Sequence, residues 1–378
     1  MTIVPLYLSE ISPTNRRGAI GGVHFLMFAV GLLISQGLSF FPLNTEELWP
    51  VAVSLGGVFG LFGLGMIPFC PETPRHLAIA KALDDDAQTV LQKLRGKHNI
   101  RTELDEMKYE REVEKKRGVS GFFNTVRCRS PGWKQPIVMA IFLQLLQQVS
   151  LITAFTFNSV ETWRNTNITE ESLFYIIIGS DALIILTALI PIFVSDSYGR
   201  KGLVIIGYSF CVFFLGTLTM CISLEPTLES KWTMWGSLIS IYSFLMAFSL
   251  GPGSMPYVII PEMFTHEPRS YVVGASNQIF WFSNLVMSFL YPVILDALGA
   301  YTFIVFIVLM IPLIVLLQIY LPETKRNTYV ENAALFISPE GEEKESDKLI
   351  VLTKRSKEEH KDGGVVLLKF DKNTEKLV

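Results

Sequence analysis

The sequence predicts an all-α protein that crosses a membrane several times. Half of its 378 residues are hydrophobic, the mean hydropathy is +0.39, and apolar runs of about 20 residues recur along most of the chain. A helix needs a run of this length to cross the hydrocarbon core of a bilayer, where the backbone must satisfy its own hydrogen bonds. We expect eight spans, at residues 18–41, 49–70, 136–160, 173–195, 202–223, 233–261, 270–295 and 302–321.

Basic residues indicate the orientation of these spans. All but two of the 32 Lys and Arg residues fall on one side of the expected spans, and the exceptions are Arg164 and Lys231. Cytoplasmic loops carry the excess of Lys and Arg. We therefore expect both ends of this chain to be cytoplasmic.

The opening stretch, VPLYLSEISPTNRRGAIGG, turns polar too early to hold a complete span before the first turn. It places Glu10 seven residues before Arg17, and Glu262 precedes Arg269 by the same spacing. Both pairs flank a proline-containing cytoplasmic turn that leads into a new span. The recurrence favours an internal duplication of helix bundles, as in many transporters. The alternative is coincidence, because charged residues belong in any cytoplasmic loop.

The segment between the second and third spans, residues 71–135, is rich in charge. Apolar residues such as Val90, Leu91 and Leu94 recur in it at helical spacing. Mixed charge of this kind usually marks a solvated surface. We therefore interpret the segment as a cytoplasmic helical linker without chemistry of its own.

The third span has the most polar core, in the run QLLQQVSLITAFTFNS. Its glutamines Gln144, Gln147 and Gln148 lie toward one sector of a helix. An amide offers both a donor and an acceptor, so it can recognise a hydroxyl group without burying an ion. Hydrogen bonds between helices are the alternative use of these side chains.

The fourth span contains the one acidic residue that we place at membrane depth, Asp181. A carboxylate there costs about 2.5–3.5 kcal/mol, so it should face a cavity or be protonated. A direct role with the substrate or a proton is one reading, and a helix-interior site satisfied by serine or backbone groups is the alternative. The preceding loop carries an N-x-S/T sequence at Asn167, a candidate glycosylation site. The span ends in DSYGRKG, which brings Asp196 and Arg200 to the cytoplasmic surface as candidates for a lock between helix ends.

The sixth span runs into the stretch GPGSMPYVIIPEMFTHEPRS. Proline removes a backbone donor and glycine leaves the backbone loosely specified, so the helix must break at Gly251, Pro252, Gly253 and Pro256. This break is either a structural kink or a functional hinge beside a binding site. The last span ends in LPETK, with Glu323, and residues 338–378 read as a disordered cytoplasmic tail.

Several segments together resemble the sugar-porter branch of the major facilitator superfamily, and most of all its facilitative glucose transporters. The matching segments, in the order of the family, are VPLYLSEISPTNRRGA, LWP, PFCPETPRHL, VLQKLRG, QLLQQVSLI, DSYGRK, GPGSMPYVIIPEMF with HEPRS, and LPETK. The resemblance implies two six-helix bundles around a central cavity, alternating access without covalent chemistry, and a small neutral polar solute, a hexose, as cargo. It also implies the lipid bilayer of the plasma membrane as the location.

The resemblance also implies a division of the chain. Residue 1 falls near the end of the family's fourth span, so about four spans of the family have no counterpart here. Residues 1–70 would be the remainder of the first bundle, 71–135 the linker, 136–321 the second six-helix bundle and 322–378 a largely disordered tail. A short form that does not transport, and acts as a sensor or a scaffold or has no activity, is therefore the alternative to a transporter.

The family's functional positions carry over residue by residue. The resemblance implies a substrate site at Gln147, Gln148, Asn284, Trp281, Tyr257 and Thr153, and a cytoplasmic gate at Glu10, Arg17, Asp196, Arg200, Glu262, Arg269 and Glu323. The chain departs from the family at several substrate positions, where it has Phe25, Thr153, Ile184, Ser249, Tyr257 and Phe280. These departures allow a cargo that differs from glucose or is more apolar than glucose.

No enzymatic chemistry is visible in the sequence. We find no nucleophile with a base, no phosphate-binding loop, and no metal-ligand spacing among the four cysteines. We therefore expect no catalytic residue, no cofactor, no metal and no nucleic-acid partner.

Overall fold

The computed structural model describes residues 2–40, 48–96, 100–117, 133–157, 170–228 and 231–336. Every regular element in these ranges is helical, as the sequence predicts. The candidate glycosylation site Asn167 and the tail beyond Phe336 lie outside the described residues.

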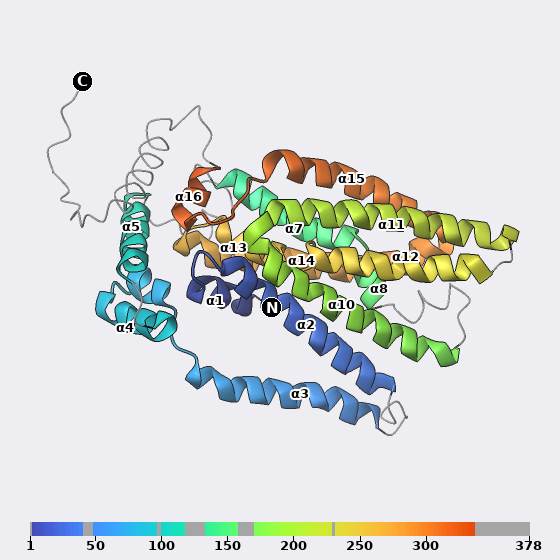
Figure 1. Ribbon diagram of the computed structural model, residues 1–378, viewed down its shortest axis with the longest axis horizontal. Helices are drawn as coiled ribbons and strands as arrows, with labels where there is room; N and C mark the ends of the chain where they lie inside the picture. Colours follow the sequence, from blue (N-terminus) through green and yellow to red (C-terminus); the bar gives the residue numbers. More distant parts are fainter. Residues whose placement is uncertain are drawn as a thin grey trace.

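Long helices form the body of the molecule (Figure 1). They are α2 (Arg17–Phe40), α3 (Trp49–Met66), α7 (Lys134–Val149), α10 (Glu170–Tyr198), α11 (Arg200–Leu228), α12 (Lys231–Leu250), α14 (His266–Leu298) and α15 (Thr302–Tyr320).

Shorter helices connect or extend them. They are α1 (Ile3–Ile11), η1 (Ile67–Phe69), the π-helix η2 (His76–Ala80), α4 (Asp84–Arg95), α5 (Arg101–Arg117), α8 (Ile152–Phe157), α13 (Pro256–Glu262), η3 (Gly299–Tyr301) and α16 (Tyr329–Ala334).

Each of the eight expected spans contains one helix or two consecutive helices. Five stretches of the described residues are long and apolar enough to cross a membrane, and the last of them, His266–Tyr320, combines α14 and α15. The span expected at 49–70 gives a shorter apolar helix, Val53–Phe69. The span expected at 136–160 is interrupted after Val149, where Leu151 adopts φ 68° and separates α7 from α8.

The long helices pack side by side around an apolar core. α11 runs along α12, α10 along α2, and α14 against α7. Fully buried side chains such as Tyr208, Phe244 and Phe306 fill the interior. Helix α3 lies apart from the other long helices and exposes apolar side chains along most of its length (Figure 1). Such a surface is suited to lipid or to further helices rather than to water.

The linker helices form a small body at one end of the bundle, near α1, α13 and α16 (Figure 1). Residues from η2, α4 and α5 share their own apolar cluster, which includes Leu77, Leu91, Leu104 and Met107. The acidic first turn of α4 and its basic last turn both complement the helix dipole. The part of this segment that the structure describes is thus helical and folded.

Candidate functional site

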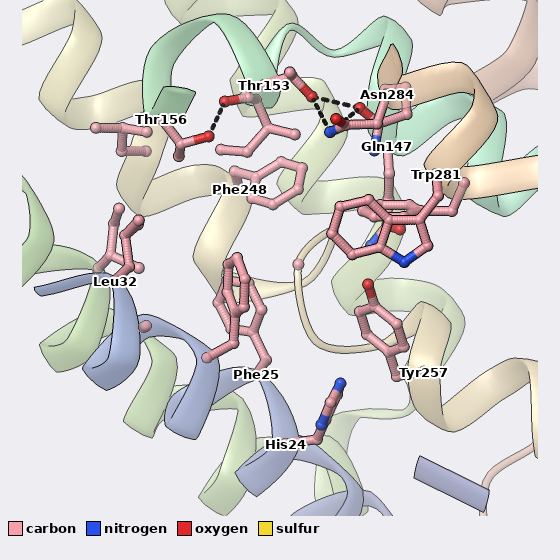
Figure 2. Close-up of a pocket in the computed structure, with 18 residues that line it drawn as sticks. His24, Phe25, Leu32, Gln147, Thr153, Thr156, Phe248, Tyr257, Trp281 and Asn284 are labelled. Carbon is pink, nitrogen blue, oxygen red and sulfur yellow. Dashed lines mark hydrogen bonds between the residues drawn. The ribbon is translucent and has the colours of Figure 1, made fainter. Parts of the chain in front are cut away.

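A cavity opens between α2, α7, α8, α12, α13 and α14 (Figure 2). The cavity is open to solvent, and the empty space in and around its mouth amounts to about 750 Å3. All the residues that we assigned to a substrate site line it, namely Gln147, Gln148, Thr153, Tyr257, Trp281 and Asn284. The folded chain therefore brings these positions together from α7, α8, α13 and α14.

Three of these residues form a hydrogen-bonded cluster. The Oε1 atom of Gln148 accepts hydrogen bonds from Thr153 Oγ1 (2.5 Å) and from Asn284 Nδ2 (3.4 Å). Asn284 Nδ2 also donates to Thr153 Oγ1 (3.0 Å), as Figure 2 shows. The break between α7 and α8 positions this cluster, because it brings Thr153 back toward Gln148.

Gln147 connects the cavity to the interruption between α12 and α13. Its Nε2 atom donates to the carbonyl oxygen of Pro252 over 2.7 Å. Gln147 Oε1 and Gln148 Nε2 are both buried without a hydrogen-bond partner among the described residues. Buried polar groups are normally paired, so these two atoms are a candidate acceptor and a candidate donor for a ligand.

The interruption that the sequence predicts lies between Leu250, where α12 ends, and Pro256, where α13 begins. A Cβ on Gly251 would lie 2.1 Å from the carbonyl oxygen of Leu203, so only glycine fits at this approach. A Cβ on Gly253 would lie 2.5 Å from the Phe25 ring. The segment therefore packs tightly against α11 and α2, and its action as a hinge stays a prediction.

The wall that α2 contributes is largely apolar. His24, Phe25, Phe28 and Leu32 line the cavity from this helix, and the ring of His24 meets Tyr257 edge to face at 5.0 Å between centroids. Of these residues, Phe25 alone was predicted from the sequence to lie at a substrate position. The helical spacing of positions 24, 25, 28 and 32 places them on one face of α2, but the sequence does not tell which face of the helix is turned to the cavity.

Asp181 does not line this cavity. It is buried in α10, and its Oδ2 atom has no hydrogen-bond partner among the described residues. A direct role of this carboxylate in the site is therefore not supported by the geometry.

The two Glu–Arg pairs of the predicted cytoplasmic gate exchange partners. Arg17 Nη1 lies 3.9 Å from Glu262 Oε1, and Arg269 Nη1 lies 3.5 Å from Glu10 Oε1. Each repeated segment thus supplies its arginine to the glutamate of the other. Arg200 Nη2 joins the same group at 3.3 Å from Glu262 Oε1.

Two other acids of the gate cap helices. Asp196 accepts hydrogen bonds from the backbone N–H groups of Gly18 (3.1 Å) and Ala19 (3.2 Å), and it also pairs with Arg200 over 2.9 Å. Glu323 accepts from the backbone N–H groups of Arg200 (2.9 Å) and Lys201 (3.1 Å). Carboxylates at these N-termini complement the helix dipole, so both acids tie α2 and α11 to neighbouring segments.

Tyr329 lies at the centre of this group and was not predicted from the sequence. The guanidinium carbons of Arg269, Arg17 and Arg75 lie 3.7, 3.9 and 4.4 Å from the centroid of its ring. Its hydroxyl donates to the carbonyl oxygen of Ser9 over 2.7 Å. Tyr329 begins α16, whose capping box of Thr328 and Glu331 was a readable signal for an ordered helix.

The linker helix α5 also enters the group. Glu110 pairs with Arg75 and lies 3.4 Å from Arg269. It further accepts the backbone N–H of His266 (2.9 Å), and Glu114 accepts that of Glu267 (2.9 Å), so α5 caps the first turn of α14. Neither Glu110 nor Arg75 was among the predicted gate residues.

The charged surroundings change the pKa of Glu10. Burial would raise the pKa of this carboxyl, but His266, whose Nδ1 lies 3.2 Å from Glu10 Oε1, and the charge of Arg269 outweigh burial and lower the pKa to about 2. The pKa of Arg75 is raised. Burial would lower the pKa of its guanidinium, but the charges of Glu110 and Glu106 outweigh burial. Both groups are therefore ionised at neutral pH.

Comparison with known proteins places these features in a family. A family model described as "Sugar (and other) transporter" matches residues 1–336. The chain is 32% identical over 335 residues to "Solute carrier family 2, facilitated glucose transporter member 5" of Equus caballus, and the match covers 88% of this chain and 66% of that relative. The protein of the same name from Rattus norvegicus is 32% identical over 359 residues, with 92% and 70% covered.

Among solved structures, the fold matches the proton:xylose symporter XylE, of the major facilitator superfamily, bound to 6-bromo-6-deoxy-D-glucose, with a TM-score of 0.77 at 20% identity. That match covers 88% of this chain and 70% of the symporter. The inward-open form of XylE from E. coli gives a TM-score of 0.59 at 19% identity, with 88% and 68% covered. This chain thus spans about two thirds of the length of these two glucose-transporter relatives.

Proposed function

Because this chain belongs to the sugar (and other) transporter family, we propose that it moves a hexose or a related small neutral solute across a membrane by alternating access. The observation that carries the proposal is the cavity with two unpartnered amide atoms, Gln147 Oε1 and Gln148 Nε2. Relatives named as facilitated glucose transporters support a hexose as cargo. No covalent step is required, because transport needs only that the site binds the solute on one side of the membrane and releases it on the other.

The exchanged ion pairs support the same proposal. They connect α1 and α2 with α13 and α14 at one end of the bundle, so the cavity cannot open at that end while Arg17–Glu262 and Arg269–Glu10 hold. Opening would separate the pairs and let water reach the charges, which offsets part of the lost attraction. The group would then act as the gate that rocks open and closed in each cycle.

The chain is an integral, multi-pass membrane protein, and we propose the plasma membrane as its location with both ends of this chain cytoplasmic. The one-sided distribution of Lys and Arg supports this orientation. An epitope placed at the C-terminus tests it: antibody should reach the epitope only in permeabilised cells. Labelling of intact cells would contradict the orientation.

Flux of radiolabelled hexose into proteoliposomes tests the transport function. We expect the 378-residue chain to exceed empty vesicles, and Gln148→Leu to lower the initial rate by about tenfold, because it removes the free donor and the acceptor of Thr153 and Asn284. Gly216→Ala, on α11 with no atom near its added methyl group, serves as the matched control. Flux equal to empty vesicles would instead favour the non-transporting alternative.

A further inference from the structure

Polar side chains gather on one side of the cavity, where Gln147, Asn284, Trp281 and Tyr257 lie (Figure 2). Thr153 and Asn284 bond to Gln148 Oε1, and Thr156 donates to the carbonyl oxygen of Ile152. The unpartnered amide atoms Gln147 Oε1 and Gln148 Nε2 belong to side chains that are 2% and 0% exposed. A ligand that reaches these two atoms would therefore find an acceptor and a donor on consecutive residues of α7.

The wall formed by Phe25, Phe28, Leu32 and Phe248 offers no polar side-chain atom. Phe25 packs against Phe28, with ring centroids 6.3 Å apart, and against Phe248 at 6.4 Å. Figure 2 shows Phe25, Phe248 and Leu32 on one side and Gln147, Asn284 and Trp281 on the other. Phenyl and alkyl side chains have no donor or acceptor, so this wall can solvate only an apolar surface.

An unsubstituted hexose fits this division poorly. It carries hydroxyl groups around its whole ring, and those turned toward Phe25 and Phe28 would lose water without gaining a partner. A hexose with an apolar substituent fits both sides, because its remaining hydroxyl edge can meet the amides while the substituent covers the phenyl wall.

From this division we propose that the preferred cargo is a hexose bearing an aryl or alkyl substituent, as in a simple glycoside. Its hydroxyl edge would bond to Gln147 Oε1 and Gln148 Nε2, and its substituent would lie against Phe25, Phe28 and Phe248. The inference rests on the proposed function and narrows its substrate class. It makes Phe25 the residue that determines specificity.

Equilibrium binding of phenyl β-D-glucopyranoside and of D-glucose tests the proposal. The full chain is reconstituted in liposomes that are free of glycoside detergents, because such detergents would compete with the ligand for the site. Empty liposomes correct for partition of the phenyl compound into lipid. We expect the glycoside to bind about tenfold tighter or more, since an apolar substituent gains a matching wall. Equal or tighter binding of glucose, or binding of neither compound, overturns the proposal.

Two substitutions at one position sharpen the test. Phe25→Gln places an amide in the apolar wall, so we expect the ratio of glycoside affinity to glucose affinity to fall by about fivefold or more. Phe25→Leu keeps the wall apolar, so we expect this ratio to stay unchanged. Equal effects of the two variants overturn the role of Phe25. Tight glycoside binding with no flux of either compound would refute transport and leave the ligand class intact.

Discussion

The guanidinium of Arg269 lies over the ring of Tyr329, 3.7 Å from its centroid. Arg17 and Arg75 approach the same ring, and the three arginines come from α14, α2 and the segment before the linker helices. Like charges gathered this closely would repel one another. The aromatic ring, together with Glu10, Glu110 and Glu262, makes their approach favourable.

Tyr329→Leu is therefore expected to lower the free energy of unfolding by about 2–4 kcal/mol, since it removes several desolvated cation–π contacts. Tyr329→Phe keeps the ring and loses the bond to Ser9, so it should cost about 1 kcal/mol. Denaturation of the purified protein in one detergent, compared among the three forms, gives the values. Equal losses for Phe and Leu would show that the ring contributes nothing beyond the hydroxyl.

Arg200→Ala should bias the protein away from the outward-open state. Arg200 pairs with Glu262 and Asp196 and is fully buried, so its loss leaves Asp196 without its arginine, leaves Glu262 with Arg17 alone, and weakens cytoplasmic closure. A cysteine introduced at Ala29, which lines the cavity, reports the change. We expect a membrane-impermeant thiol reagent applied from the cytoplasmic side to label it several-fold faster in the Arg200→Ala background.

The accessibility measurement has its own control. Lys201→Ala removes a neighbouring cation whose Nζ donates to the carbonyl oxygen of Gln318 and pairs with none of the gate acids in the described residues. It should leave the labelling rate unchanged. Unchanged labelling from both sides in Arg200→Ala would contradict a role for Arg200 in closure.

Gly251→Ala should be strongly destabilising. The added methyl group would lie 2.1 Å from Leu203 O, a backbone atom that moves only if α11 moves with it. Overpacking of this kind costs about 1–3 kcal/mol or more. Gly216→Ala, which meets no atom within 4 Å inside helix α11, should be neutral or stabilising by up to about 1 kcal/mol. Similar thermal unfolding of both variants would show that the close approach at Gly251 is not required.

The sequence predicts the spans well because hydropathy depends on composition and length alone. It also predicts the break at Gly251–Pro256 from local backbone chemistry, and the residues of the cavity from a family resemblance. It does not reveal that Arg17 pairs with Glu262 and Arg269 with Glu10, because the exchange depends on how distant helices pack. The position of Tyr329 between arginines is hidden for the same reason.

The acid dependence of stability should reveal the contribution of Glu10. Its pKa is lowered to about 2, so the contact with Arg269 and His266 contributes fully above the ordinary glutamate pKa of about 4.5 and is lost as the pH falls from there toward 2. The contribution is on the order of 3 kcal/mol. Glu10→Gln should therefore be less stable than the parent at neutral pH, and the difference should shrink between about pH 4.5 and pH 2. Thermal unfolding of both forms across this range measures the difference, and a gap that stays constant with pH would contradict the assignment.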